Sequence, residues 1–328
     1  MKVLFAAMQW DYGFKERGPS FELTNLFDAM RRMDGLEVRL FDFMELHQSG
    51  GPDLVSRELV RTVDDWKPDL LFAVLFTDEV PQDVLAELRD RPGLTTFNWF
   101  CDDHWRFDDF TSVYAPLFNA CSTTARSALP KYQVIGYDAV IKTQWACNQH
   151  LYRPTVGPLR YDVTFVGQPH GNRRQVIEQL SKRTVPIQTW GQGWEAGRLE
   201  QEDMVATFSD SRINLNLSNS SVPSNRWRRF LGRGHQTYGD QIKGRNFEIP
   251  SCGGFQLSGA SEDLESYFEP DREIVIFHDD DELAAAIERY LADEPARAAI
   301  AAAGYRRAIH EHTYAHRFRE IFSTLGLS

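Results

Sequence analysis

The sequence predicts an α/β protein made of two doubly wound, Rossmann-like domains. Short apolar segments of strand length alternate with helix-length segments through most of the 328 residues, a pattern typical of parallel sheets with helices on both faces. The alternation lapses at residues 148–160, where turn-forming residues cluster, and then starts again. A chain of this length also exceeds the usual size of one hydrophobic core. We therefore expect one domain in each half.

The first half opens with a predicted strand at residues 2–8, a loop that contains Gly13 and Gly18, and a helix-like segment at 20–33. This order of strand, loop and helix begins a parallel βαβ unit. Apolar runs predict further strands at 37–43, 69–76 and 94–101, and periodic segments predict helices at 54–66 and 82–89. We expect the first domain to span residues 1–150.

The second half repeats the alternation and ends in helices. The expected strands are 162–167, 186–190, 212–217, 255–258 and 273–277, and the expected helices are 172–182, a short one near 243, 281–292 and 295–310. We expect a second domain at 151–310 and a last segment, 311–328, whose helix returns to the first domain. Two such sheets place a central cleft between the carboxyl ends of their strands, where ligands bind.

Charge and cysteine content exclude several classes of protein. The net charge of −11 disfavours nonspecific attraction to nucleic acid or anionic membranes. The four cysteines show no C-x-x-C pair, so neither a disulfide framework nor a zinc site is indicated. The apolar runs are too short for a signal peptide or a membrane span. We expect a cytoplasmic protein with no integral membrane association.

The segment 241–255 has the residues that a nucleoside diphosphate needs. Lys243 and Arg245 stand at the start of a short predicted helix, where backbone N–H groups and the helix dipole also favour phosphate oxygens. Glu248 can accept hydrogen bonds from ribose hydroxyls, and Gly253 and Gly254 can allow a ligand close to the backbone. The alternative is an ordinary surface helix with solvated cations and a glycine cap.

Two other segments of the second half are candidates for donor binding. Arg173 opens the helix after the first strand of the second domain, where phosphates often bind. Its alternative role is that of a solvent-facing arginine, because the surrounding sequence is no P-loop. Gly191 and Gly193 end the next strand and can frame a base beside Trp194, which can equally be a core residue.

Candidate catalytic residues follow two strands of the first half. Asp102, Asp103 and His104 come just after the strand at 94–101, and a base there can deprotonate an acceptor hydroxyl. Adjacent carboxylates also resemble a metal site, and the structural alternative is a turn or helix cap. Asp11, after the first strand, is a second candidate for acceptor contact.

Two charged clusters have simpler explanations. Asp279, followed three residues later by Glu282, predicts a helix N-cap and not a metal site. The stretch 226–233 combines four arginines with Trp227 and Phe230, a composition that can bind nucleic acid. In an acidic protein, contact with donor phosphates or an anionic acceptor is the preferred interpretation.

The chain resembles glycosyltransferases of the two-domain GT-B type, and among them the group-1 transferases of the CgeB-like spore-maturation family. The motifs that carry the resemblance are K-G-R-N-F-E-I-P at 243–250, G-G-F at 253–255 and H-T-Y-A-H-R at 312–317. Residues 9–13, 98–107 and 162–167 also look like landmarks of this family. Most of the chain is thereby covered, and the segment around Glu248 is its most specific part.

The resemblance implies transfer of a sugar from a nucleoside-diphosphate sugar, most simply a UDP-sugar, to a hydroxyl or amine. It also implies that the second domain binds the donor, that the acceptor faces the first domain, and that no metal or other cofactor is required. Related transferases contact the donor with two glutamates that have seven residues between them. Glu248 matches the second of these, and Asp240 stands at the first position.

Other functions remain open from the residues alone. A nucleotide-sugar 2-epimerase-like isomerase needs the same donor and no acceptor, and a non-catalytic protein can read nucleic acid or glycan through the stretch 226–233. The acceptor, whether glycan, protein, small molecule or modified nucleic acid, depends on pocket shape, which the sequence does not display. The sequence also leaves the stereochemical outcome and the oligomeric state open.

Overall fold

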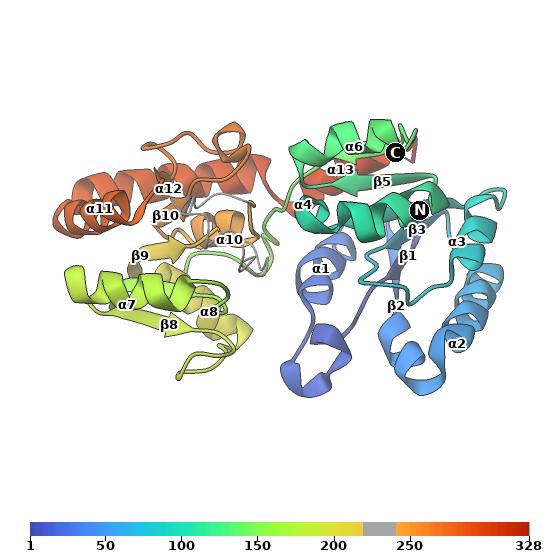
Figure 1. Cartoon of the computed structure of the whole chain (residues 1–328), viewed down its shortest axis with the longest axis horizontal. Helices are drawn as coiled ribbons and strands as arrows, with labels where there is room; N and C mark the ends of the chain where they lie inside the picture. The colour runs from blue at the N-terminus through green and yellow to red at the C-terminus, as the bar shows by residue number, and fades with distance from the viewer. Residues whose placement is uncertain (219–240, 328) are drawn as a thin grey trace, which may run out of the picture. The chain divides into compact units, whose positions relative to one another are not determined.

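Each half of the chain forms a parallel sheet flanked by helices. The computed structural model describes residues 1–218 and 241–327 (Figure 1). Contacts divide the chain into two units, one of residues 1–144 with 314–328 and the other of residues 145–313. The predicted α/β class with two doubly wound, Rossmann-like sheets is confirmed.

The first unit contains a six-stranded sheet in the order β2-β1-β3-β4-β5-β6, all parallel. Its strands are β1 (Lys2–Ala6), β2 (Glu37–Phe41), β3 (Leu70–Ala73), β4 (Thr95–Phe100), β5 (Ala120–Thr123) and β6 (Val140–Lys142). Sequence analysis did not predict the last two strands. β5 consists of small and polar residues and β6 has only three residues at the sheet edge, so neither gives an apolar run.

Alternate residues of these strands cover the two faces of the sheet, as strand geometry requires. Leu4 and Leu71 belong to a core that includes residues of α2 (Phe43–Trp66), α3 (Gln82–Arg89) and α6 (Leu129–Val134). On the other face, the ring of Phe5 lies 5.3 Å from that of Phe72 and 5.7 Å from that of Phe27. Both faces of the sheet are therefore buried, which explains the continuous apolar runs in its strands.

The C-terminal helix α13 (Tyr314–Thr324) completes the second face. Figure 1 shows this red helix among the blue and green elements of the first unit, and it contacts α1 (Asp28–Met30). The fully buried Phe318 lies 5.7 Å from Phe72 between ring centroids, and Tyr314 lies 6.3 Å from Trp99. The predicted return of the last helix to the first domain is confirmed.

Two helices of the first unit differ from their predicted ranges. The helix predicted at 54–66 begins earlier, at Phe43, because Asp42 accepts hydrogen bonds from the backbone of Met44 and Glu45 and caps it. It is interrupted at Gly50 and Gly51, which leave helical geometry. The helix predicted at 20–33 contains a π-helical segment, Glu22–Phe27, before α1.

The second unit contains a five-stranded parallel sheet in the order β11-β10-β9-β7-β8. Its strands are β7 (Tyr161–Val166), β8 (Ile187–Trp190), β9 (Ser211–Asn216), β10 (Gln256–Gly259) and β11 (Val275–Phe277). Its helices are α7 (Arg173–Arg183), α8 (Gln201–Ser209), α10 (Arg245–Ser251), α11 (Asp280–Ala292) and α12 (Glu294–Glu311). Apolar residues of α7 and α11 form one core with the strands. The predicted cap of α11 is confirmed, since Asp279 accepts from the backbone of Asp281 and Glu282.

Strand order reverses once in each sheet, between β1 and β3 and between β7 and β9. In open α/β sheets, ligands bind at the carboxyl ends of the strands beside such a switch point. The loops after these four strands are therefore the places to look for sites. No helix within the described ranges is both long enough and apolar enough to span a membrane.

Replacing Phe318 by alanine should lower the free energy of unfolding by about 3–5 kcal/mol, because it leaves a cavity between α13 and the sheet. Denaturant unfolding measures the change. Arg319→Ala alters an exposed neighbour on the same helix and should stay within about 0.5 kcal/mol. Equal, small effects of the two changes would show that α13 does not pack on this sheet.

Candidate functional site

Three cationic side chains and one histidine gather at the switch point of the second sheet. Arg173, the first residue of α7, is largely buried and donates to the carbonyls of Gln168 (3.1 Å) and Leu217 (2.7 Å). These carbonyls belong to the loops after β7 and β9, so Arg173 ties the two strand ends together. His170, Lys243 and Arg245 are the other members of this group, which we call the cationic cluster.

Arg245 and Glu248 form an ion pair on α10, one helical turn apart. The Glu248 side chain is fully buried and that of Arg245 is 28% exposed. Arg245 Nε also donates to the carbonyl of Val166, the last residue of β7, at 3.3 Å. The second carboxylate oxygen of Glu248, Oε1, is buried without a hydrogen-bond partner in the described part of the chain. A ligand with a hydroxyl donor would satisfy this oxygen.

Hydrogen bonds hold Lys243 beside this pair. Its backbone N–H donates to Oδ1 of the buried Asn246 at 2.9 Å, and its Nζ donates to Oε1 of Gln241 at 2.6 Å. Asn246 in turn donates to Ser258 Oγ, at 2.9 Å, on β10. Sequence analysis did not single out Asn246, whose role depends on contact with a strand distant in sequence.

The members of the cationic cluster perturb one another. Burial and the nearby charge of Arg245 lower the pKa of Arg173 to about 10. Burial and the charges of Arg173 and Lys243 lower the pKa of His170 from its ordinary value of 6.5. Each pKa shift reflects the free energy needed to hold positive charges close together where they are poorly solvated. A bound anion would lower this free energy.

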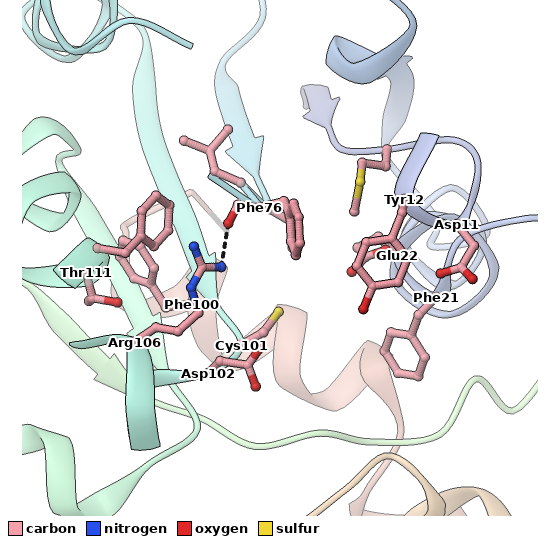
Figure 2. A pocket seen from close by; sticks show the side chains of 14 residues that line it. Asp11, Tyr12, Phe21, Glu22, Phe76, Phe100, Cys101, Asp102, Arg106 and Thr111 are labelled. Carbon is pink, nitrogen blue, oxygen red and sulfur yellow. Dashed lines mark hydrogen bonds between the residues drawn. The ribbon is translucent and has the colours of Figure 1, made fainter. Parts of the chain in front are cut away.

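In the first unit, a pocket of about 180 Å³ lies at the carboxyl ends of β1, β3 and β4 (Figure 2). Carboxylates, aromatic rings and one arginine line it, including Asp11, Tyr12, Glu22, Phe76, Asp102 and Arg106. Arg106 donates to the carbonyl of Phe76 and packs 4.4 Å from the ring of Phe110. The pocket thus lies beside the switch point of the first sheet, between β1 and β3.

The structure separates the four predicted catalytic candidates. Asp11 and Asp102 line the pocket. Asp103 is 2% exposed and accepts from Thr111 Oγ1 (2.6 Å) and Tyr132 hydroxyl (2.8 Å). Burial raises its pKa, and these hydrogen bonds act in the opposite direction. Neither Asp103 nor His104 is among the residues that line the pocket, so Asp103 links the start of α4 (Asp103–Arg106) to the core.

Comparison with known proteins finds a family match in the second half of the chain. Residues 173–323 match the family model described as glycosyl transferase-like. This part of the chain is similar to that family. It contains the whole cationic cluster except His170, together with Glu248, so the family match and the geometry fall on the same residues. No curated protein matches the sequence.

Solved structures show the same fold over the whole chain. Sucrose-phosphate synthase from Thermosynechococcus elongatus has a TM-score of 0.69 at 12% identity and covers 99% of each chain. Anabaena HepE in complex with UDP-glucose has a TM-score of 0.62 at 14% identity, also over 99% of each chain. AviGT4, a glycosyltransferase involved in avilamycin A biosynthesis, has a TM-score of 0.61 at 14% identity over 100% of this chain and 98% of its own. The GT-B fold expected from the resemblance is confirmed.

Gly191 and Gly193 pack against the loop after β7, which leads to Arg173. Gly191 has a φ of 139°, and a Cβ there would lie 2.4 Å from the carbonyl oxygen of Gly167. A Cβ on Gly193, at φ 99°, would lie 3.0 Å from Pro169 Cγ. Trp194 Nε1 also donates to the Gly167 carbonyl at 2.7 Å. Because Gly191 and Gly193 have no side chains, their loop can pack directly against the loop after β7.

Gly253 and Gly254 lie between α10 and β10. Gly253 has a φ of 71° directly after α10, which fits the glycine-cap alternative. A Cβ on Gly254 would lie 2.7 Å from the Phe208 carbonyl, so this position requires close packing. The contacts of both glycines are structural.

The remaining candidates fall outside the described residues. These are Asp240 and the basic stretch 226–233. Sequence analysis did not single out His170 or Glu22. Each lies near the end of a strand only because of how the connecting loop folds. Within residues 1–218 and 241–327, no group of three or more histidine, cysteine, aspartate or glutamate side chains is arranged to hold a metal ion.

Gly191→Ala should destabilise the protein by about 1–3 kcal/mol more than Gly197→Ala, as expected for overpacking. Both glycines have positive φ, but a Cβ on Gly197 would meet nothing within 4 Å. The pair therefore compares a glycine position that a Cβ would overfill with one in open space. Thermal or denaturant unfolding measures both variants, and equal destabilisation would contradict the close approach of the two loops.

Proposed function

We propose that this chain transfers a sugar from a nucleoside-diphosphate sugar to an acceptor hydroxyl or amine. The observation that carries this proposal is the cationic cluster at the switch point of the second sheet, with the buried Glu248 beside it. The family match to residues 173–323 supports glycosyl transfer. In this proposal the second unit holds the donor, and the pocket of the first unit receives the acceptor.

The cationic cluster suits a diphosphate in particular. Arg173 and Arg245 hold the strand ends through backbone carbonyls, and Lys243 adds a third full charge next to them. Charge-assisted hydrogen bonds to phosphate are among the stronger interactions that proteins form. The charge that develops on a leaving diphosphate would be stabilised by side chains already in place.

Glu248 is proposed as the ribose ligand. One carboxylate oxygen is engaged by Arg245, and Oε1 is buried without a partner in the described part of the chain. A buried acceptor left unsatisfied costs about 1–3 kcal/mol, and a ribose hydroxyl would remove this cost. The ion pair holds the carboxylate in position, so little motion is needed on binding.

Relatives support uridine diphosphate as the carrier. One HepE structure is described in complex with UDP-glucose, and another in complex with UDP. S. aureus TarM, with a TM-score of 0.55 over 82% of this chain, also has a described complex that contains UDP. A UDP-sugar is therefore the first donor to test here. The cations of the cluster would carry the charge on the diphosphate, so we expect transfer without an added metal ion.

The acceptor side of the proposal rests on Asp11 and Asp102. Both carboxylates line the pocket of the first unit, whereas Arg106 is its one lining cation among the described residues. A pocket with this balance favours an acceptor that is uncharged or carries an amine, because carboxylates accept from hydroxyl and ammonium donors and repel anions.

Thermal unfolding in the presence of nucleotides tests the donor. A ligand that binds only the folded state at 100 times its Kd stabilises the protein by about 2.7 kcal/mol. UDP and a UDP-sugar should raise the unfolding temperature, and chelation with EDTA should leave the shift unchanged. The absence of any shift with UDP, UDP-glucose, UDP-galactose and UDP-N-acetylglucosamine would contradict a UDP-sugar donor. Conversion of the sugar without any acceptor would point to an isomerase.

Lys243→Ala should lower kcat/KM by about 10- to 100-fold with little loss of stability, since it removes one phosphate contact from a partly exposed side chain. Lys182→Ala, on the exposed last turn of α7, is the matched control and should retain wild-type activity. Arg245→Ala is a less specific test of phosphate binding, because it also leaves the Glu248 carboxylate buried and unpaired. Retention of full activity by Lys243→Ala would place the diphosphate elsewhere.

A further inference from the structure

We infer that the pocket of the first unit binds a ring that carries an ammonium group, with the Glu22 carboxylate as its counter-ion. This inference rests on the proposed function, because the ring would belong to the acceptor. Glu22 begins the π-helical segment Glu22–Phe27, after the loop that follows β1. Its side chain lines the pocket together with Asp11 and Asp102, and all the lining residues belong to the first unit.

The charged side chains at the pocket leave one negative charge unbalanced. Asp11 forms an ion pair with Arg17 at 3.2 Å. Arg106 donates to the carbonyl of Phe76, and in the described ranges no arginine or lysine forms an ion pair with Glu22. Among the described residues, three carboxylates therefore stand against two arginines. One monovalent cation would balance the difference.

The pKa of Glu22 reflects this excess of negative charge. Burial raises it above the ordinary value of 4.5, and the charges of Asp11 and Asp102 raise it further. Hydrogen bonds from its own backbone and from Ser20 act in the opposite direction. Ionised Glu22 is thus held near other carboxylates where it is incompletely solvated, and a bound cation would lower the free energy of this state.

Two further groups at the pocket respond to the same negative charge. Burial raises the pKa of the Tyr12 phenol and of the Cys101 thiol, and nearby carboxylates that include Glu22 add to both shifts. Arg17 lowers the pKa of Tyr12, and Arg106 lowers that of Cys101, but the net direction is upward in each case. The potential at the pocket therefore favours a positive ligand. The charged and titratable groups around Glu22 are Asp11, Tyr12, Arg17, Cys101, Asp102 and Arg106.

Aromatic side chains form the other walls of the pocket. The rings of Tyr12 and Phe76 meet edge to face, with centroids 5.3 Å apart, and both side chains are partly exposed. Figure 2 shows Glu22, Asp11 and Tyr12 grouped on one side of the pocket, with Phe76 facing them. Aromatic rings pack against the apolar face of another ring and attract cations. The walls thus suit the ring of the ligand, and the carboxylates suit its ammonium group.

The size and charge of the pocket exclude other ligands. A cavity of about 150 Å³ holds a benzene ring, so a volume of about 180 Å³ has room for one ring of similar size. Phosphate or carboxylate groups would be repelled by the lining carboxylates. In the described part of the chain, no group of three or more acidic, histidine or cysteine side chains is arranged to hold a metal ion. An organic cation the size of an amino sugar meets these limits.

Binding of glucosamine and glucose to the wild-type chain provides the test. The two sugars differ by an amine in place of one hydroxyl, and near neutral pH most of the amine is charged. We expect a Kd for glucosamine about 10- to 100-fold lower than that for glucose, which is the range expected for a charge-assisted hydrogen bond. Calorimetry with and without UDP measures both values. N-acetylglucosamine lacks the charge and should show no such gain, and glucuronate should bind more weakly than glucose.

Equal Kd values for glucosamine and glucose, or no binding of glucosamine, would overturn the inference. Failure of UDP to bind would instead overturn the proposed function, because UDP and glucosamine are titrated separately. The two failures are therefore distinguishable in one set of titrations.

Glu22→Gln locates the counter-ion. The variant keeps the shape of the side chain and removes its charge, so the two Kd values should come within about threefold of each other. Glu16→Gln removes an exposed carboxylate of the same loop and should keep the wild-type preference. Thermal unfolding shows whether each variant is folded. A folded Glu22→Gln variant that still prefers glucosamine by tenfold or more would contradict the assignment of Glu22.

The pH dependence of binding gives a readout that needs no variant. The protonated Glu22 side chain carries no charge, so the affinity for glucosamine should fall as the pH drops through the pKa of Glu22, which lies above 4.5. The affinity for glucose should change little over the same range. A preference for glucosamine that stays constant to below pH 4.5 would show that Glu22 is not the counter-ion.

Discussion

The buried ion pair between Arg245 and Glu248 is the interaction on which the proposed donor site depends. Glu248 has no access to solvent, and its charge is tolerated only because Arg245 lies against it. Breaking such a pair typically costs about 3–5 kcal/mol, since one charge is left buried alone. Arg245 also donates to the carbonyl at the end of β7. The pair therefore fixes the position of Arg245 in the cationic cluster and the orientation of the Glu248 carboxylate.

The two sheets place their polar side chains at equivalent positions. Each has its strand order reversed beside the first strand, and each gathers polar side chains at that point. The second unit gathers cations and one buried carboxylate, whereas the first gathers carboxylates among aromatic rings. This division of charge matches the chemistry of glycosyl transfer, in which a diphosphate leaves and an acceptor loses a proton.

Much of the fold was predictable because buried parallel strands are continuous apolar runs, and β1, β3, β4 and β7 all carry this signal. β5 and β6 were not predictable, since one consists of small and polar residues and the other has three residues. Within the proposed site, Arg173, Lys243, Arg245 and Glu248 could be singled out as candidates by residue type and by position at or near a predicted helix start. Asn246 could not, because its role arises from its contact with Ser258 on a strand distant in sequence. Asp103 and Gly254 had the right residue type, but their contacts are with the core.

A crystal structure with UDP bound tests the central claim most directly. We expect the diphosphate oxygens to lie within hydrogen-bond distance of Lys243 and Arg245, with a ribose hydroxyl donating to Oε1 of Glu248. Arg173 should remain on the carbonyls of Gln168 and Leu217. A nucleotide bound in the pocket of the first unit, or ordered away from the carboxyl end of β7, would contradict this account.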